Sequence, residues 1–302
     1  MKCVSLSVLL VCLTYAQPPD PEGFRISVDV DWVVLPASVH DRGGHTVTKL
    51  RQQNFEVFED GKPQEIRLFR QDDIPVTVGL VIDHSGSMRE KLADVTAGAR
   101  AFVRSSNPND QMFVVNFNES VSVGLPVGMR FSDSAEQLGD AIWAFQARGM
   151  TALYDAVIES LERLQLGTSD KKVLIVISDG GDNASQAGLD RVLKMAARSN
   201  AVIYTIGIFD ADDSDRNPRV LSRLARESGG EAFFPHQLSQ TVQICESIAR
   251  DIRNQYTIGY VSTNKIQDGA YRRVRLAARS HENEKLSVRT RAGYSGAKSA
   301  AK

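Results

Sequence analysis

The chain has 302 residues, enough for one large domain and a smaller one at about 150 residues per domain. Its 36 basic and 37 acidic residues almost cancel, so no overall field favours nucleic acid or an anionic membrane surface. The apolar fraction of 42% is that of an ordinary globular protein, which excludes a largely disordered chain. We therefore expect a folded protein without a nucleic-acid partner.

Residues 1–16 have the pattern of a signal peptide. Lys2 provides a positive start, Val4 to Leu13 form an apolar run, and Ala16 ends a small-residue cleavage site. The run is too short to span a bilayer, which takes about 20 residues. Cys12 follows a bulky valine where a lipoprotein signal has a small residue, so we expect cleavage after Ala16 and no lipid anchor. The mature protein is then expected in the periplasm or outside the cell, and no later segment is apolar enough to span a membrane.

Removal of the signal peptide leaves one cysteine, Cys245. An intrachain disulfide is then excluded. Cys245 falls in the apolar pattern of a helix, so we expect it to be a small buried side chain with no redox role.

Residues 17–73 are predicted to form an N-terminal β module. Apolar and polar side chains alternate from Phe24 to Trp32, as in a half-buried strand. Asp60 and Gly61 predict a tight hairpin turn, and Gln64 to Phe69 form the returning strand. About four strands are expected, too few to bury a good core alone.

Residues 74–254 alternate between strand and helix patterns, which predicts a doubly wound, mostly parallel, Rossmann-like α/β sheet. Val76 to Ile82 and Val173 to Ile177 are apolar without alternation, as in buried parallel strands. The other expected strands are 112–117, 121–125 (an antiparallel edge), 201–208 and 231–234; the expected helices are 91–105, 134–145, 152–166, 187–199, 218–228 and 239–253.

Residues 255–294 return to the strand pattern. Because these strands and the N-terminal ones both lack partners, we expect the two flanks to pair into one small β-sandwich that carries the α/β domain as an insertion. The arginines of the last strands are expected on the solvent face, with an anionic polymer as the less favoured explanation; they are Arg272, Arg273, Arg275, Arg279, Arg289 and Arg291. Residues 295–302 are small and polar, so a disordered tail is expected.

Oxygen-bearing side chains follow both apolar runs, at the strand ends where open α/β sheets bind ligands. Asp83, Ser85 and Ser87 come after the first run, Asp179 comes after the second, and Thr151 lies between them. Two carboxylates with hydroxyls, and neither Cys nor His, form a ligand set for a hard cation. Mg²⁺ fits best, because it takes few protein carboxylates and keeps waters or a partner's oxygen; Mn²⁺ and Ca²⁺ are the alternatives.

These residues resemble the metal-ion-dependent adhesion site of the von Willebrand factor A domain. The family's D-x-S-x-S is complete as Asp83, Ser85 and Ser87, its threonine matches Thr151, and its later aspartate matches Asp179. The resemblance covers roughly residues 74 to 254. The overall order of signal peptide, β flank, A domain and β flank also resembles bacterial secreted proteins of this family that are common in acidobacteria, with looser motifs.

The resemblance implies an exported, non-enzymatic binding protein that captures an Asp or Glu of a protein partner through the metal ion. Ser85 and Ser87 would ligate directly, Thr151 directly or through water, and the two aspartates would supply charge. The alternative is a structural or assembly component of the cell envelope, in which the β-sandwich binds and the metal only stabilises a loop. Neither reading gives the oligomeric state.

Several other readings of the same residues are weaker. Asp83 and Asp179 could cap helices. A phosphatase of the haloacid dehalogenase type would need an aspartate at position 85, and a serine hydrolase would need the first glycine of G-x-S-x-G. Residues 210–215 lack the glycine and the closing glutamate of a calcium loop, so a solvated turn is expected. Asn118 and Asn183 begin glycosylation sequons that matter only in a eukaryotic secretory route.

Overall fold

The computed structural model describes residues 32–210, 216–266 and 268–296. The predicted signal peptide, nearly all of the strand predicted over 24–32, and most of the predicted tail lie outside these residues. Trp32 is the exception at the N-terminal end, where it opens the first strand.

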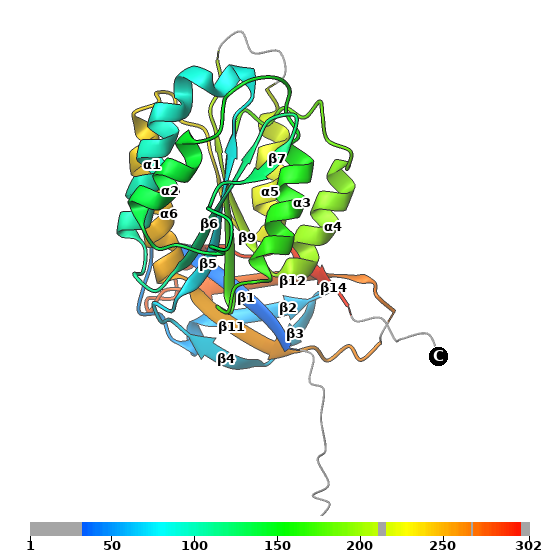
Figure 1. The fold of residues 1–302 in the computed structure, drawn as a ribbon. Helices are drawn as coiled ribbons and strands as arrows, with labels where there is room; N and C mark the ends of the chain where they lie inside the picture. The colour runs from blue at the N-terminus through cyan, green and yellow to red at the C-terminus, as the bar shows by residue number, and fades with distance from the viewer. Residues whose placement is uncertain (1–31, 211–215, 267, 297–302) are drawn as a thin grey trace, which may run out of the picture. The chain divides into compact units, whose positions relative to one another are not determined.

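A six-stranded sheet with the order β10-β9-β8-β5-β6-β7 forms the centre of the α/β domain (Figure 1). Neighbouring strands are parallel throughout, except that β7 runs antiparallel to β6 at the edge. The predicted doubly wound sheet and its antiparallel edge strand are therefore confirmed. The strands are β5 (Val76–Asp83), β6 (Gln111–Phe117), β7 (Val121–Val123), β8 (Lys171–Ser178), β9 (Val202–Gly207) and β10 (Ala232–Phe233).

Helices cover both faces of this sheet, with α1, α2 and α6 on one face and α3, α4 and α5 on the other (Figure 1). Each begins and ends within a few residues of the predicted bounds. Asn217 caps α5, which begins at Pro218 and ends before Gly229, where φ is +88°. The helices are α1 (Leu92–Ser105), α2 (Ala135–Trp143), α3 (Leu153–Leu164), α4 (Leu189–Ser199), α5 (Pro218–Ser228) and α6 (Gln240–Asn254).

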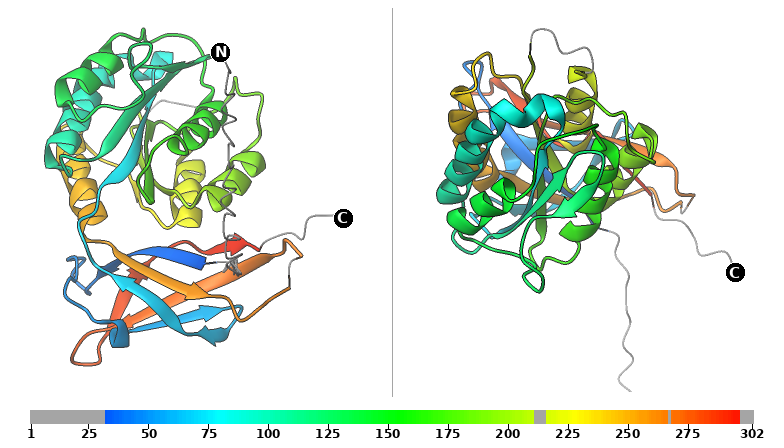
Figure 2. Two further views of the ribbon diagram at one scale, coloured as in Figure 1. Left: turned by 60° about the horizontal axis from the view of Figure 1, so that its bottom comes forward. Right: turned by 45° about the horizontal axis from the view of Figure 1, so that its top comes forward.

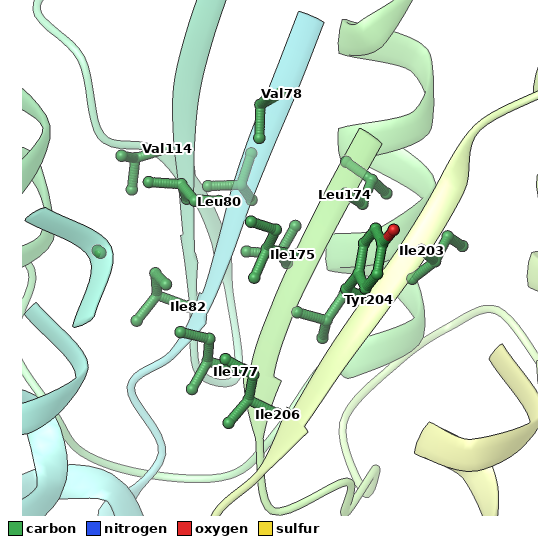
Figure 3. Close-up of a cluster of buried hydrophobic side chains, with 14 of the residues drawn as sticks. Val78, Leu80, Ile82, Val114, Leu174, Ile175, Ile177, Ile203, Tyr204 and Ile206 are labelled. Carbon is green, nitrogen blue, oxygen red and sulfur yellow. The ribbon is translucent and has the colours of Figure 1, made fainter. Parts of the chain in front are cut away.

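The core of this domain lies on both faces of β5 and β8 (Figure 3). Every residue of β5 is buried, which is why its sequence shows no polar alternation. Gly79 belongs to this packing, because a Cβ there would come within 2.6 Å of Leu174 and Phe113. Cys245 on α6 is buried in the same core, as predicted, and burial raises the pKa of its thiol to about 12.

The strands from the two ends of the chain form a second sheet, with the order β3-β2-β12-β13-β1-β11-β4 and β14 paired to β12. Figure 2 shows the blue N-terminal and orange to red C-terminal strands side by side in this sheet. The strands are β1 (Trp32–His40), β2 (Phe55–Glu59), β3 (Lys62–Gln64), β4 (Ile66–Arg70), β11 (Tyr256–Val261), β12 (Tyr271–Arg279), β13 (Lys285–Arg289) and β14 (Gly293–Ser295).

This second sheet is nearly closed. Only Glu65 separates β3 from β4, yet β3 pairs with β2 at one end of the order and β4 pairs with β11 at the other. The pairing of the two flanks into one sandwich-like module is thus confirmed, and the module has its own hydrophobic core around Leu35, Tyr256 and Tyr260. The predicted turn at Asp60 and Gly61 is also present, with φ +47° and +81°.

Two predictions for the C-terminal flank are wrong. Arg272 and Arg291 are each only 6% exposed, whereas Arg273, Arg275 and Arg279 are exposed as expected. Arg272 is buried because it reaches Glu59, Ser262 and the carbonyl of Asn264. The tail does not begin at residue 295, because Ser295 pairs with Tyr271 in β14. Among the described residues, no helix has the length and apolar character needed to cross a membrane.

Candidate metal site

Asp83 is the last residue of β5, and its carboxylate is held from two sides. The backbone N–H of Ser85 donates to Oδ1 at 2.8 Å, and the Ser178 hydroxyl donates to Oδ2 at 2.6 Å. Ser178 ends β8, which is the parallel neighbour of β5. The Asp83 side chain is fully buried, so both oxygens are fixed at the carboxyl edge of the sheet.

Ser85, Ser87 and Asp179 continue from this carboxylate as one chain of contacts. Ser85 Oγ lies 3.1 Å from Ser87 Oγ, and the Ser87 hydroxyl donates to Asp179 Oδ2 at 2.5 Å. The short 3₁₀-helix Gly86–Lys91 turns the loop back after Ser85 and so brings both hydroxyls to the same side. Four of the five predicted residues are therefore brought together across two adjacent strands.

Thr151 lies in the segment between α2 and α3, against both of these loops. Its N–H donates to Asn183 Oδ1 at 2.8 Å, and its carbonyl accepts from the N–H groups of Asn183 and Ala184, each at 3.0 Å. Two residues earlier, the carbonyl of Gly149 accepts from the N–H of Gly86 at 3.2 Å. The fifth residue is thus positioned between the loop that carries Ser85 and the loop that follows Asp179.

The two carboxylates make this edge electrostatically strained without a cation. Burial, and next the negative charge of Asp179, raise the pKa of Asp83 to about 7. Asp83 forms no ion pair with any residue of the described part of the chain. A bound cation would relieve both causes, because it replaces lost hydration and separates two like charges.

The donor set fits a hard divalent cation. The site offers carboxylate and hydroxyl oxygens, and the described ranges contain no cluster of three or more His, Cys, Asp or Glu side chains such as a structural zinc site would require. Asp83 and Asp179 would supply the charge, while Ser85, Ser87 and Thr151 would supply neutral oxygens. Two carboxylates balance the formal charge of a divalent ion without filling its coordination shell, so positions remain for waters or an incoming oxygen.

His84 does not activate Ser85. Its Nε2 lies 3.0 Å from Asn116 Oδ1, and its ring packs edge-on against Phe145. Burial lowers the pKa of His84 to about 4, so the ring is neutral near pH 7. His84 is therefore a packed core histidine and not a catalytic base. This agrees with the absence of the G-x-S-x-G motif of a serine hydrolase.

The helix-capping alternative for the two aspartates is wrong. The N-cap of α1 is Lys91 and that of α4 is Gly188, so neither Asp83 nor Asp179 begins a helix. Of the predicted solvated turn over 210–215, only Asp210 is described, and it pairs with the buried Lys91 at 2.8 Å. The sequon residue Asn118 is buried and its side chain accepts from Ser120, a local turn contact.

Three residues of this site were not singled out as functional by the sequence pattern. Ser178 orients Asp83, Asn183 holds Thr151, and Gly149 adopts φ +73° beside the carboxylate of Glu119. A supporting role for Ser178 and Gly149 could have been predicted, because Ser178 directly precedes Asp179 and Gly149 lies two residues before Thr151. Nothing in the sequence around Asn183 shows that its side chain would reach back to residue 151.

The fold and this polar edge define an α/β domain with oxygen ligands gathered at the carboxyl ends of two neighbouring central strands. The family model for the von Willebrand factor type A domain matches residues 77–247, more than half of the chain. The chain therefore belongs to the von Willebrand factor type A domain family. A comparison with curated protein sequences gave no match.

Solved structures agree on the fold. A von Willebrand factor type A protein from Catenulispora acidiphila is 15% identical, with a TM-score of 0.53, and the match covers 89% of this chain and 74% of that one. Proximal thread matrix protein 1 from the mussel byssus is also 15% identical, with a TM-score of 0.51 and coverage of 65% and 51%. At these identities the likeness extends to the fold alone, and the first match includes most of the β module.

Proposed function

We propose that this protein is an exported, non-enzymatic binding protein whose A domain captures an acidic side chain of a protein partner through Mg²⁺. The five residues proposed to hold the ion are Asp83, Ser85, Ser87, Thr151 and Asp179. The observation that supports this most is the continuous set of contacts from Asp83 through the two serines to Asp179 at one edge of the sheet. Type A domains are protein-interaction modules, and this membership supports the proposal further.

The proposed capture depends on an incomplete ligand shell. When bound, the ion would supply an open coordination position that a carboxylate oxygen can fill. The residues of this chain keep that position oriented: Ser178 fixes Asp83, and Asn183 fixes Thr151. Gly86 and Gly149 are both exposed, so a partner's side chain has access to the edge from their side.

Isothermal titration of Mg²⁺ and Mn²⁺ into the mature protein, beside Asp179→Ala, tests the metal site. We expect saturable binding that the substitution abolishes, because it removes one of only two carboxylates. The matched control is Asp182→Asn, since Asp182 lies three residues further along the same loop and its Oδ1 accepts from Tyr154 N–H and Ser185. Equal binding in Asp179→Ala and the unaltered protein would contradict the proposal.

Partner capture separates this function from the alternative of an envelope component that binds through its β module. A pull-down against carboxylate-bearing proteins, with and without EDTA, is carried out with the double variant Asp83→Ala and Ser85→Ala. Loss of capture in both EDTA and the variant supports binding through the metal. Capture that survives both would favour the β module as the binding surface.

Export is tested by the mass of the protein recovered from the periplasm or medium. A chain that begins at Gln17 is expected, because cleavage after Ala16 fits the small-residue site. Recovery of the uncleaved chain in the cytoplasm would contradict export.

A further inference from the structure

A second polar recess lies away from the metal residues, where the α/β domain meets β1 and β13. It is a groove of about 800 Å³, within the range of roughly 300–1,000 Å³ usual for ligand sites. Its walls come from His40 and the turn that follows β1, from Phe233 on β10, from Asp251 near the end of α6, and from Arg289 on β13. None of the five proposed metal residues lines it.

Asp251 places an unsatisfied acceptor in this groove. Its Oδ2 accepts from Ser38 Oγ at 3.0 Å, from Tyr204 Oη at 2.5 Å and from Arg289 Nη2 at 2.5 Å. Its Oδ1 is buried and has no hydrogen-bond donor; the nearest basic atom is His40 Nε2 at 3.9 Å. The residue is 7% exposed.

The arrangement of Asp251 is that of a fixed acceptor. Three donors on one oxygen prevent the carboxylate from turning to satisfy the other. A buried acceptor without a donor costs free energy, so a ligand hydroxyl that displaces the groove wall far enough to reach Oδ1 recovers that cost.

The rest of the lining indicates which ligand fits. The lining contains three arginines and three carboxylates, so the formal charges cancel and neither a strongly anionic nor a cationic ligand is favoured. Among the described residues that line the groove, Phe233 is the only apolar side chain, which excludes a largely apolar ligand. The remaining polar side chains include the hydroxyls of Thr46, Thr48, Ser247 and Ser287.

We propose that this groove binds a neutral saccharide. Sugar hydroxyls both donate and accept, so they match a wall that offers arginine and hydroxyl donors beside the Asp251 acceptor. Phe233 offers an apolar surface for the C–H face of a sugar ring. Because the arginine and carboxylate charges of the groove balance, the net charge of a ligand does not decide its binding. The positions of its hydroxyl groups do.

The test uses the full chain in EDTA, so that the metal site cannot contribute, and three neutral probes: cellotetraose, maltotetraose and the β-1,4-linked tetramer of N-acetylglucosamine. Saturation-transfer NMR and calorimetric titration are expected to show saturable binding of at least one probe. Asp251→Asn and Phe233→Ala are each expected to weaken that binding at least tenfold. The matched control is Phe234→Ala, since Phe234 is the next residue but stacks on Phe209 and does not line the groove.

Three results would overturn the proposal. They are no saturable binding of any probe in EDTA, equal binding by the two groove variants and the unaltered protein, and binding that appears only when Mg²⁺ replaces EDTA. Thermal melts of every variant distinguish loss of the groove from loss of the fold. If Asp251→Asn does not fold, Ser287→Ala replaces it, because Ser287 is an exposed residue of the same wall with no partner in the Asp251 network.

Discussion

The Asp83 carboxylate lowers the stability of the metal-free protein at neutral pH, but the proposed metal site requires it. Its pKa is raised to about 7, mainly by burial and then by Asp179, from 3.8 in the absence of these effects. The native state therefore holds the proton more tightly than the unfolded state. The stability that this group contributes is fully present below pH 4 and is lost as the pH rises through 7, at about 1.4 kcal/mol per pKa unit of difference.

The substitution Asp83→Asn should separate these two roles. In EDTA we expect the variant to match the unaltered protein near pH 4 and to be increasingly more stable up to pH 8, because asparagine cannot ionise. Its Oδ1 can still accept from Ser85 N–H. In saturating Mg²⁺ at pH 8 the order should reverse, since only the unaltered protein gains from binding. Thermal melts across pH, with and without Mg²⁺, measure both; a variant less stable than the unaltered protein in EDTA at pH 8 would contradict the account.

Ser178 is expected to tune the same carboxylate. Its hydroxyl donates to Asp83 Oδ2 and accepts from Gly180 N–H, so Ser178→Ala leaves two buried groups unpaired and should cost about 1–3 kcal/mol of stability. The lost donor also raises the pKa of Asp83 further, so Mg²⁺ affinity should fall at pH 7 and recover in part at pH 9. Calorimetric titration at both values measures this. Ser160→Ala is the control, because Ser160 is equally buried but donates to Ala156 within α3.

At the scale of elements, the site was largely predictable because its residues follow strands whose character is unambiguous. Asp83 and Asp179 come directly after runs buried on both faces, and parallel strands must end at the same edge. The segment that carries Thr151 was less predictable. It contains neither helix nor strand, and its position depends on contacts with Asn183 and Gly86 that no periodicity encodes.

The backbone conformation of Gly149 sets the path of the segment that carries Thr151. It has φ +73°, and a Cβ there would lie 1.6 Å from Glu119 Oε2, the atom that accepts from Met150 N–H. Gly149→Ala should therefore cost about 1–3 kcal/mol of stability through backbone strain, displace Glu119, and weaken Mg²⁺ binding by moving Thr151. Chemical denaturation and metal titration measure the two effects. Gly188→Ala is the control, since a Cβ at Gly188 meets nothing within 4 Å and its φ is negative; an equal effect there would contradict the explanation.

At the scale of the whole molecule, the sequence predicted that the two β flanks pair but not how. The partners that join the two flanks are at least 187 residues apart, as between Arg70 and Thr257, so no turn fixes which strand lies beside which. The burial of Arg272 and Arg291 was missed for the same reason. Their partners Glu59 and Asn200 come from distant segments, and an alternating arginine in a strand otherwise indicates a solvent face.

Removal of the C-terminal flank tests whether the β module depends on both ends of the chain. A chain that ends at Asn254 loses β11 to β14, so β1 loses both neighbours, β2 loses β12, and only the β2–β3 pair of the module remains. Asp251 also loses Arg289, its charged donor. We expect an aggregated or proteolysed N-terminal flank and a lower melting temperature for the A domain, because the exposed core and open strand edges of the module would face water.

A chain that ends at Gly296 keeps every described strand and serves as the control. Both chains are compared by size-exclusion chromatography, limited proteolysis and thermal melts. A soluble truncated protein with the melting temperature and Mg²⁺ affinity of the full chain would show that the A domain folds independently of the module.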